Sequence, residues 1–148
     1  MKSEKLLFSK NFHRDQLNLI AEEIKKHLGS KTLVLWKGPV GAGKTTLISV
    51  LGQILGFTAA SSPSFAIHHR YENQLKQTLD HVDLYRLTDE ADLDSTGFWD
   101  LFQQEEAWIM VEWSDRIASH AWPLNWPTLQ IELEKLEGDQ RSIRILQV

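Results

Sequence analysis

Apolar residues in the N-terminal half of the chain recur at spacings that switch between helical and extended. Between residues 13 and 28 they fall every three or four positions on one helical face, and Gly29 follows. This pattern predicts an amphipathic helix that ends near the glycine and covers a sheet with its apolar stripe. The apolar run 33–36 predicts a buried strand, and a second helical pattern begins at Thr46 and ends at Gly56.

Extended patterns dominate the C-terminal half. Residues 65–71 and 78–84 predict two strands joined by a hairpin loop, and short helical turns are expected within 89–104. The nearly continuous apolar run 107–111 is typical of a central parallel strand that is buried on both faces. From residue 129 to residue 145, apolar and polar residues alternate around a turn that contains glycine, which predicts a second hairpin with one face in water.

The amino-acid composition predicts a single globular domain and argues against a secreted, membrane-spanning or strongly RNA-binding protein. A chain of 148 residues that is 42% hydrophobic and 24% charged has the usual make-up of one globular domain, here residues 1–148. With zero cysteines, an apolar segment at 6–8 too short for a signal peptide and no segment that could span a bilayer, the expected location is cytoplasmic, away from membranes. A net charge of −4 argues against a broad basic surface for direct RNA binding.

The octet GPVGAGKT matches the phosphate-binding loop pattern G-x-x-x-x-G-K-[ST] and lies between a predicted strand and a predicted helix. Gly38, Gly41 and Gly43 allow the backbone N–H groups to converge on phosphate oxygens at the helix N-terminus. Lys44 is expected to neutralise the β- and γ-phosphates, and the Thr45 hydroxyl to bind Mg²⁺. An ordinary glycine-rich turn is the alternative, but the strand and helix context disfavours it.

Two carboxylates follow predicted strands. Glu112 comes directly after the run 107–111, and Asp83 ends the stretch 81–83. In open α/β sheets the carboxyl ends of parallel strands carry the ligand site, so both side chains are candidates for holding Mg²⁺ or orienting water. The alternative is that they cap a helix or pair with Arg86 or Arg116.

The stretch SSPSF at 61–65 lies in the loop after the phosphate-loop helix. P-loop nucleotidases offer a hydroxyl to the metal or the γ-phosphate from a loop in this place. Serine and proline also populate ordinary turns, so the pattern by itself favours neither interpretation.

These motifs, taken in chain order, resemble those of the TsaE (formerly YjeE) family. The resemblance rests on the phosphate loop from Gly38 to Leu47, SPSF ending at Phe65, HVDLYRL starting at His81, and the pair Glu112-Trp113. It spans roughly residues 13–146. The family comprises bacterial ATPases required for the biosynthesis of threonylcarbamoyladenosine in tRNA.

The resemblance implies a single-domain, P-loop NTPase-like α/β fold: a three-layer sandwich with a mixed, largely parallel central sheet and added β-hairpins. It implies Mg²⁺ bound by Thr45 and Glu112 with Asp83 nearby, and catalytic roles for Lys44, Glu112 and Asp83. The residues expected to bind ATP are Gly38, Gly41, Ala42, Gly43, Lys44, Thr45, Thr46, Ser64, Arg86 and Trp113.

The resemblance also implies partners. Family members act with TsaD, which transfers the threonylcarbamoyl group to an adenosine of tRNA, and with TsaB; the family protein supplies an ATPase cycle and meets tRNA only indirectly. The chain departs from the family at Ser64, where threonine is usual, and at the aromatic residues within 97–100. The second departure puts partner contacts in that segment in doubt.

Other functions fit the sequence less well. A small-molecule kinase needs an arginine-rich lid, but the arginines are scattered. A GTP switch protein needs an [NT]-K-x-D motif, which does not occur, although Asp94 to Gly97 spells D-x-x-G. A nucleotide-dependent interaction module without significant hydrolysis is the third alternative, against which the intact Lys44-Thr45 pair argues.

Two aromatic and histidine features have plain interpretations. Adjacent histidines His68 and His69 would point to opposite faces of a strand, so packing or surface positions are expected in place of a zinc site. Trp122 and Trp126 flank prolines and predict either an exposed docking surface or a lid over the sheet edge.

Overall fold

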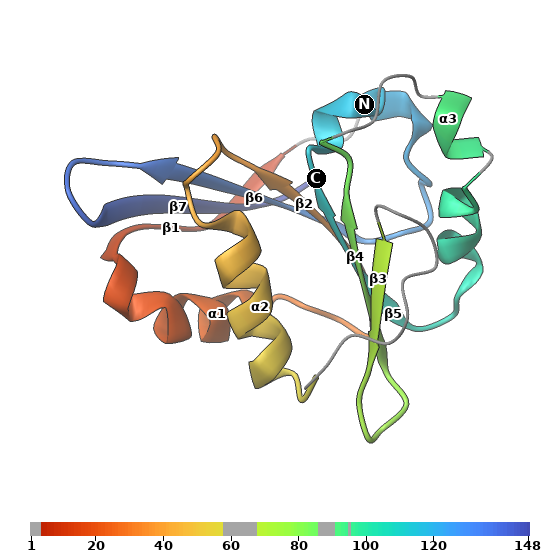
Figure 1. The fold of residues 1–148 in the computed structure, drawn as a ribbon, viewed down its shortest axis with the longest axis horizontal. Helices are drawn as coiled ribbons and strands as arrows, with labels where there is room; N and C mark the ends of the chain where they lie inside the picture. The colour runs from red at the N-terminus through yellow and green to blue at the C-terminus, as the bar shows by residue number, and fades with distance from the viewer. Residues whose placement is uncertain (1–3, 58–67, 86–90, 95) are drawn as a thin grey trace.

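The computed structural model describes residues 4–57, 68–85, 91–94 and 96–148. In this part of the chain, seven strands form one sheet in the order β1-β7-β6-β2-β5-β4-β3 (Figure 1). The strands are β1 (Lys5–His13), β2 (Lys31–Lys37), β3 (His68–Glu72), β4 (Thr78–Asp83), β5 (Ala107–Glu112), β6 (Thr128–Lys135) and β7 (Gln140–Gln147).

The middle of the sheet is parallel. Strands β6, β2, β5 and β4 run in one direction, whereas β3 pairs antiparallel with β4, and β7 pairs antiparallel with both β6 and β1. All six side chains of β5 are buried, as expected for a strand covered on both faces. The predicted hairpins are β3–β4 and β6–β7, and the predicted mixed, largely parallel α/β sheet is confirmed. The face of β6 that is expected in water is exposed only toward the turn, because Gln130 is buried.

Helices and 3₁₀ turns cover both faces of the sheet. Helices α1 (Leu17–Lys26) and α2 (Lys44–Ile54) lie together on one face (Figure 1). The segments on the other face are α3 (Ala91–Asp94) and the 3₁₀ turns η2 (Phe98–Gln103), η3 (Ser114–Arg116) and η4 (Ser119–Ala121). Among the described residues, no helix is both long and apolar enough to cross a membrane.

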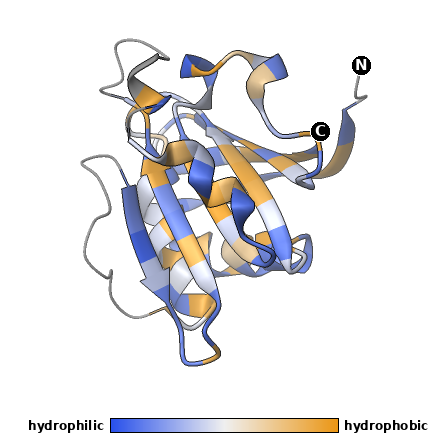
Figure 2. Ribbon diagram, turned by 90° about the vertical axis from the view of Figure 1, so that its right-hand side faces the viewer, coloured by the Kyte–Doolittle hydropathy of each residue, from blue (hydrophilic) through white to orange (hydrophobic). Residues whose placement is uncertain are grey.

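Each face of the sheet has its own core, and hydrophobic residues are frequent along the central strands between the two layers (Figure 2). On the α1–α2 side, Trp36 and Trp108 belong to the core, which places both tryptophans where the strand pattern predicts them. On the other side, Trp126 is completely buried and Trp122 packs against the same cluster. The segment that contains them is therefore a lid on the sheet.

The N-terminal strand β1 and the start of the first helix differ from the sequence prediction. The sequence does not predict β1, because only Phe12 of its nine side chains is buried and no alternation of apolar residues marks it. The helix expected over 13–28 begins with the 3₁₀ turn η1 (Arg14–Gln16), becomes α-helical at Leu17 and ends at Lys26. His13 caps η1: its Nδ1 accepts the Asp15 backbone N–H at 3.2 Å, and its own backbone N–H donates to Gln16 Oε1 at 2.8 Å.

Asp80 on β4 is a fully buried carboxylate that ties the β3–β4 hairpin to η2. Its Oδ1 accepts from His68 Nε2 at 2.6 Å and from Arg70 Nε at 2.7 Å, while Gln104 Nε2 donates to Oδ2 at 2.9 Å. Burial alone would raise the pKa of Asp80, but the hydrogen bonds from His68, Arg70 and Gln104 hold it below its ordinary value. The carboxylate is therefore ionised in the folded protein.

We expect Asp80→Asn to lower the free energy of unfolding at neutral pH by on the order of 3 kcal/mol, because buried donors lose their charged acceptor. A depressed folded-state pKa stabilises the protein fully above the unfolded value of about 4, and this stability is lost as the pH falls through the folded value. Urea unfolding from pH 7 to pH 2 should thus show a flatter acid decline in the variant. The exposed Asp100→Asn serves as control, and equal pH slopes for Asp80→Asn and wild type would contradict the assignment.

Gly38, just after β2, lies where no side chain fits. A Cβ at this position would collide with the Leu133 carbonyl oxygen of β6, which is backbone and cannot move aside. Gly52, within α2, has a helical backbone, and nothing lies within 4 Å of the place that a Cβ would occupy there.

These two glycines make a matched pair. Gly38→Ala should destabilise the fold by about 1–3 kcal/mol through overpacking, whereas Gly52→Ala should stabilise it by about 0.5–1 kcal/mol through helix propensity. Thermal unfolding of both variants measures the two effects. A Gly38→Ala protein as stable as wild type would show that the loop does not approach β6 this closely.

Candidate functional site

The loop between β2 and α2 lies at the carboxyl end of the parallel strands. Gly43, which directly precedes α2, has a φ of +99°, and Gly41 has a φ of +86°. At either glycine, nothing lies within 4 Å of the place that a Cβ would occupy. The first residues of α2 line a cavity, and the first N–H groups of a helix, which lack intrahelical partners, are those from which phosphate oxygens accept hydrogen bonds.

Lys44, the first residue of α2, turns its side chain back along this loop. Its ammonium group donates a hydrogen bond to the Gly38 carbonyl oxygen and lies 4.6 Å from the centre of the Trp113 ring. Only 6% of Lys44 is exposed. The Gly38 carbonyl and the Trp113 ring thus hold the positive charge of Lys44 beside the loop.

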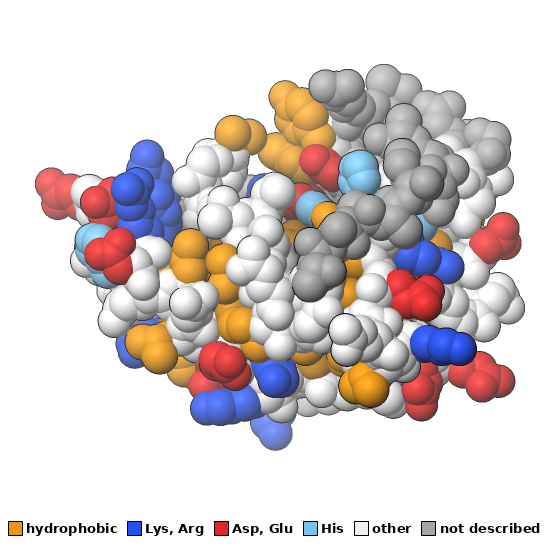
Figure 3. Space-filling model, turned by 60° about the horizontal axis from the view of Figure 1, so that its bottom comes forward, with side chains coloured by type: hydrophobic (Ala, Val, Ile, Leu, Met, Phe, Trp, Pro, Cys, Tyr) orange, Lys and Arg blue, Asp and Glu red, His pale blue; other side chains and the backbone are white. Residues whose placement is uncertain are grey.

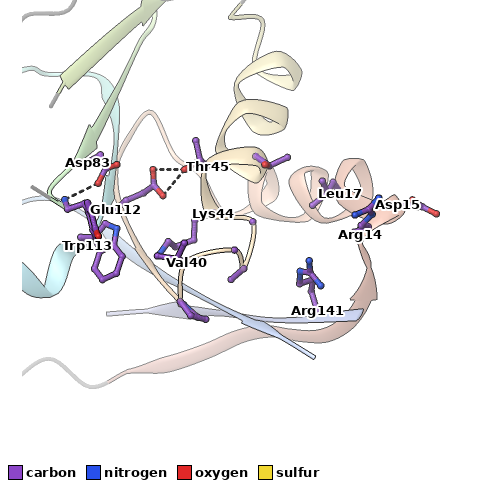
Figure 4. A pocket seen from close by; sticks show the side chains of 16 residues that line it. Arg14, Asp15, Leu17, Val40, Lys44, Thr45, Asp83, Glu112, Trp113 and Arg141 are labelled. Atoms are coloured by element: carbon purple, nitrogen blue, oxygen red, sulfur yellow. Dashed lines mark hydrogen bonds between the residues drawn. The ribbon is translucent and has the colours of Figure 1, made fainter. Parts of the chain in front are cut away.

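Thr45 and Glu112 meet across the gap between α2 and the end of β5 (Figure 4). The Thr45 Oγ1 hydroxyl lies 3.0 Å from Glu112 Oε1 and 3.1 Å from Oε2, so it donates to the carboxylate. On the other side, Glu112 Oε2 accepts from His81 Nε2 at 2.7 Å. The carboxylate is held between a helix terminus and the neighbouring strand β4.

Glu112 is ionised despite being 3% exposed. Burial alone would raise its pKa, but the hydrogen bond and charge of His81, the hydrogen bond from Thr45 and the nearby Lys44 ammonium hold the pKa below the ordinary value. An anionic oxygen pair beside a hydroxyl is a donor set suited to a hard divalent cation.

Asp83 and Trp113 lie next to this pair. Asp83 is the register partner of Glu112 across β4 and β5, is exposed, and accepts the Tyr85 backbone N–H at 2.9 Å. Trp113 has φ +59° and ψ +41°, a left-handed conformation that is uncommon for a bulky residue, and its ring packs on Tyr85 with centroids 5.1 Å apart. This backbone geometry directs the indole over Lys44.

A cavity of about 730 Å³ opens over the loop, and Figure 4 shows it reaching from Glu112 to the region of Arg14 and Arg141. Its volume is in the range of small-molecule sites. Of the residues expected to act here, nine line it, and Tyr85 lines it as well; the nine are Gly41, Ala42, Gly43, Lys44, Thr45, Thr46, Asp83, Glu112 and Trp113. Gly38 contributes its carbonyl to Lys44, whereas Ser64 and Arg86 lie outside the described residues.

The far end of the cavity is built from residues that the sequence did not point out. These are Arg14, Asp15, Leu17 and Arg141. Basic and acidic side chains lie together on the surface at this end of the molecule (Figure 3), where Arg14 Nη1 is 3.7 Å from Asp139 Oδ1. Arg14 and Arg141 are distant in sequence and reach the same end of the cavity because β1 pairs with β7, which sets Phe12 opposite Arg141. No local sequence pattern indicates the pairing of β1 with β7, so this end of the cavity could not be predicted from the sequence.

The site fits a nucleotide-bound magnesium ion better than a protein-only metal centre. Among the described residues, no three His, Cys, Asp or Glu side chains form a cluster that could hold a metal alone. Mg²⁺ is usually bound by one or two carboxylates together with substrate phosphates and water. Thr45, Glu112 and Asp83 could supply the protein ligands of such an ion, with phosphate oxygens completing the shell.

Comparisons with known proteins show the family and the fold of the chain. The family model "Threonylcarbamoyl adenosine biosynthesis protein TsaE" matches residues 12–143. The crystal structure of YdiB from Bacillus subtilis superposes with a TM-score of 0.75 at 24% identity, covering 100% of this chain and 89% of YdiB. At 24% identity, the similarity to YdiB shows a shared fold and nothing more.

Relatives named tRNA threonylcarbamoyladenosine biosynthesis protein TsaE are similar over most of the sequence. The Aquifex aeolicus protein is 33% identical over 129 residues, which is 85% of each chain. The Streptomyces coelicolor protein is 34% identical over 81% of this chain and 80% of its own, and the Synechocystis protein 33% identical over 73% and 64%. Because the family model and these relatives cover most of its length, this chain belongs to the TsaE family.

Proposed function

We propose that the chain binds and hydrolyses ATP with Mg²⁺ and thereby supports formation of threonylcarbamoyladenosine in tRNA together with TsaD and TsaB. The observation that carries the proposal is the contact between the Thr45 hydroxyl and both Glu112 carboxylate oxygens beside Lys44. P-loop nucleotidases use a loop hydroxyl and a strand-end carboxylate in this way to hold the metal of Mg-ATP. Family membership supplies the biosynthetic context.

The residues of the loop would bind the phosphates. Residues 41–45 line the cavity, so the backbone N–H groups at the N-terminus of α2 would donate to phosphate oxygens, and Lys44 would exchange the Gly38 carbonyl for them. Thr45 and Glu112 would hold Mg²⁺, which when bound neutralises negative charge on the phosphate oxygens. Leu17 and the two arginines at the far end would contact the nucleoside.

Hydrolysis requires an oriented water and compensation of charge on the phosphates. The ionised Glu112 and the adjacent Asp83 can accept hydrogen bonds from a water at the metal end of the cavity. Positive charge beyond that of Lys44 would come from Arg86 or from a partner. If a partner supplies this charge, the chain alone hydrolyses ATP weakly.

The surroundings of the cavity suit a protein partner more than RNA. Val40 in the loop is 78% exposed and Tyr85 53% exposed, so apolar surface borders the cavity. With a net charge of −4, the chain would reach tRNA through TsaD and TsaB. A role in tRNA modification also agrees with the cytoplasmic location expected from the sequence, whereas a small-molecule kinase has no support in the family assignment.

Lys44→Ala should weaken ATP binding roughly tenfold to a hundredfold, because a charge-assisted phosphate contact is worth about 1.5–3 kcal/mol. Isothermal titration calorimetry measures the affinity, and a thermal melt checks the fold. Lys135→Ala is the matched control, since Lys135 ends β6, is exposed and does not line the cavity. Unchanged ATP affinity in the Lys44 variant would rule out phosphate binding by the loop.

The purified chain should hydrolyse ATP slowly alone and faster when TsaD and TsaB are added. Phosphate release, with and without partners, measures this. Glu112→Gln keeps the shape of the side chain but removes the charge, so it should retain much of the ATP binding and lose Mg²⁺-dependent hydrolysis. A rate of phosphate release that does not change when TsaD and TsaB are added would contradict the coupling role. ATP binding without hydrolysis would support the alternative of a nucleotide-dependent interaction module.

A further inference from the structure

His81 is the described residue on β4 that contacts the Glu112 side chain. The register pairs His81 with Met110 and Asp83 with Glu112, so His81 and Glu112 are diagonal neighbours on one face of two parallel strands. Long side chains bridge such diagonal positions. The imidazole reaches Glu112 Oε2 at 2.7 Å, and the side chains are only 13% and 4% exposed.

The direction of this hydrogen bond follows from the chemistry of the two groups. An ionised carboxylate can only accept, so His81 Nε2 carries the proton that it donates to Glu112. Thr45 approaches the same carboxylate from α2. Among the described side chains, these two are the hydrogen-bond donors to Glu112.

Nucleotide binding would affect the two hydrogen bonds to Glu112 differently. In the proposed function the Thr45 oxygen becomes a metal ligand, which ends or alters its hydrogen bond to Glu112. His81 lies on the strand side of the carboxylate and is not among the residues that line the cavity. Its hydrogen bond can persist while Glu112 turns its other oxygen to the metal.

We propose that His81 is a positioning residue that holds Glu112 in the orientation needed to bind Mg²⁺ of Mg-ATP. This inference rests on the proposed ATPase function and adds a residue to it. Side chains that hold metal ligands in place contribute strongly, and their loss costs about 10–100-fold in metal affinity or activity. A residue that merely fills space beside Glu112 would affect stability and leave the coupling between Mg²⁺ and ATP unchanged.

The test compares substitutions that keep or remove the donor. Glutamine places its amide nitrogen close to the Nε2 position of histidine, whereas asparagine is too short to reach Glu112 and leucine has no donor. We would measure ATP affinity by calorimetry in excess Mg²⁺ and in EDTA, then kcat and KM, for His81→Gln, His81→Asn and His81→Leu. His120→Gln and His120→Leu, at an exposed histidine of η4, are the matched controls.

His81→Asn and His81→Leu should reduce the Mg²⁺-dependent gain in ATP affinity and kcat by roughly 10–100-fold, with unchanged affinity in EDTA. His81→Gln should keep most of the Mg²⁺-dependent gain in ATP affinity and most of kcat. The inference would be overturned if the Gln and Asn variants had the same ATP affinity and kcat, or if ATP affinity fell by the same factor in EDTA as in Mg²⁺. If the Leu variant does not fold, the comparison of Gln with Asn still decides, and a wild-type chain that fails to bind Mg-ATP would instead refute the proposed function.

Discussion

The parallel pairing of β2 with β5 and of β5 with β4 is the constraint on which the site depends. Its register sets Trp36 beside Glu112 and Glu112 beside Asp83, so both carboxylates end their strands next to the loop that leaves β2. The same loop enters α2 through a left-handed glycine, which brings the Thr45 hydroxyl to Glu112. A slip of one residue in β5 would turn Glu112 to the opposite face of the sheet and separate it from Thr45.

Strand β4 connects the stability of the fold to the geometry of the site. One of its faces carries Asp80, which is bound by His68 and Arg70 of β3 and by Gln104 after η2. The next residue, His81, points to the other face and donates to Glu112. Both carboxylates keep a lowered pKa in spite of burial because donors surround them. The hydrogen bonds that fix the edge hairpin therefore also fix the strand from which Glu112 is held.

The sequence predicts those parts of the structure that have a local pattern of residues. The phosphate-loop octet, the buried run before Glu112 and the two hairpins each have a short-range signature, and the structure places them as expected. It missed β1, because an edge strand with mostly exposed side chains has no apolar alternation. It also missed the position of Arg14 and Arg141 at one end of the cavity and the contact of His81 with Glu112, because both depend on pairing between distant strands. Such pairing leaves no mark in a single sequence.

The central claim is that the loop and Glu112 together form the site of Mg-ATP. A crystal structure of the chain with a non-hydrolysable ATP analogue and Mg²⁺ tests it most directly. The account predicts phosphates on the N-terminus of α2 and a metal at about 2.1 Å from the Thr45 hydroxyl oxygen, with Glu112 bound to it directly or through water. A nucleotide bound elsewhere, or a metal remote from both Thr45 and Glu112, would contradict the account.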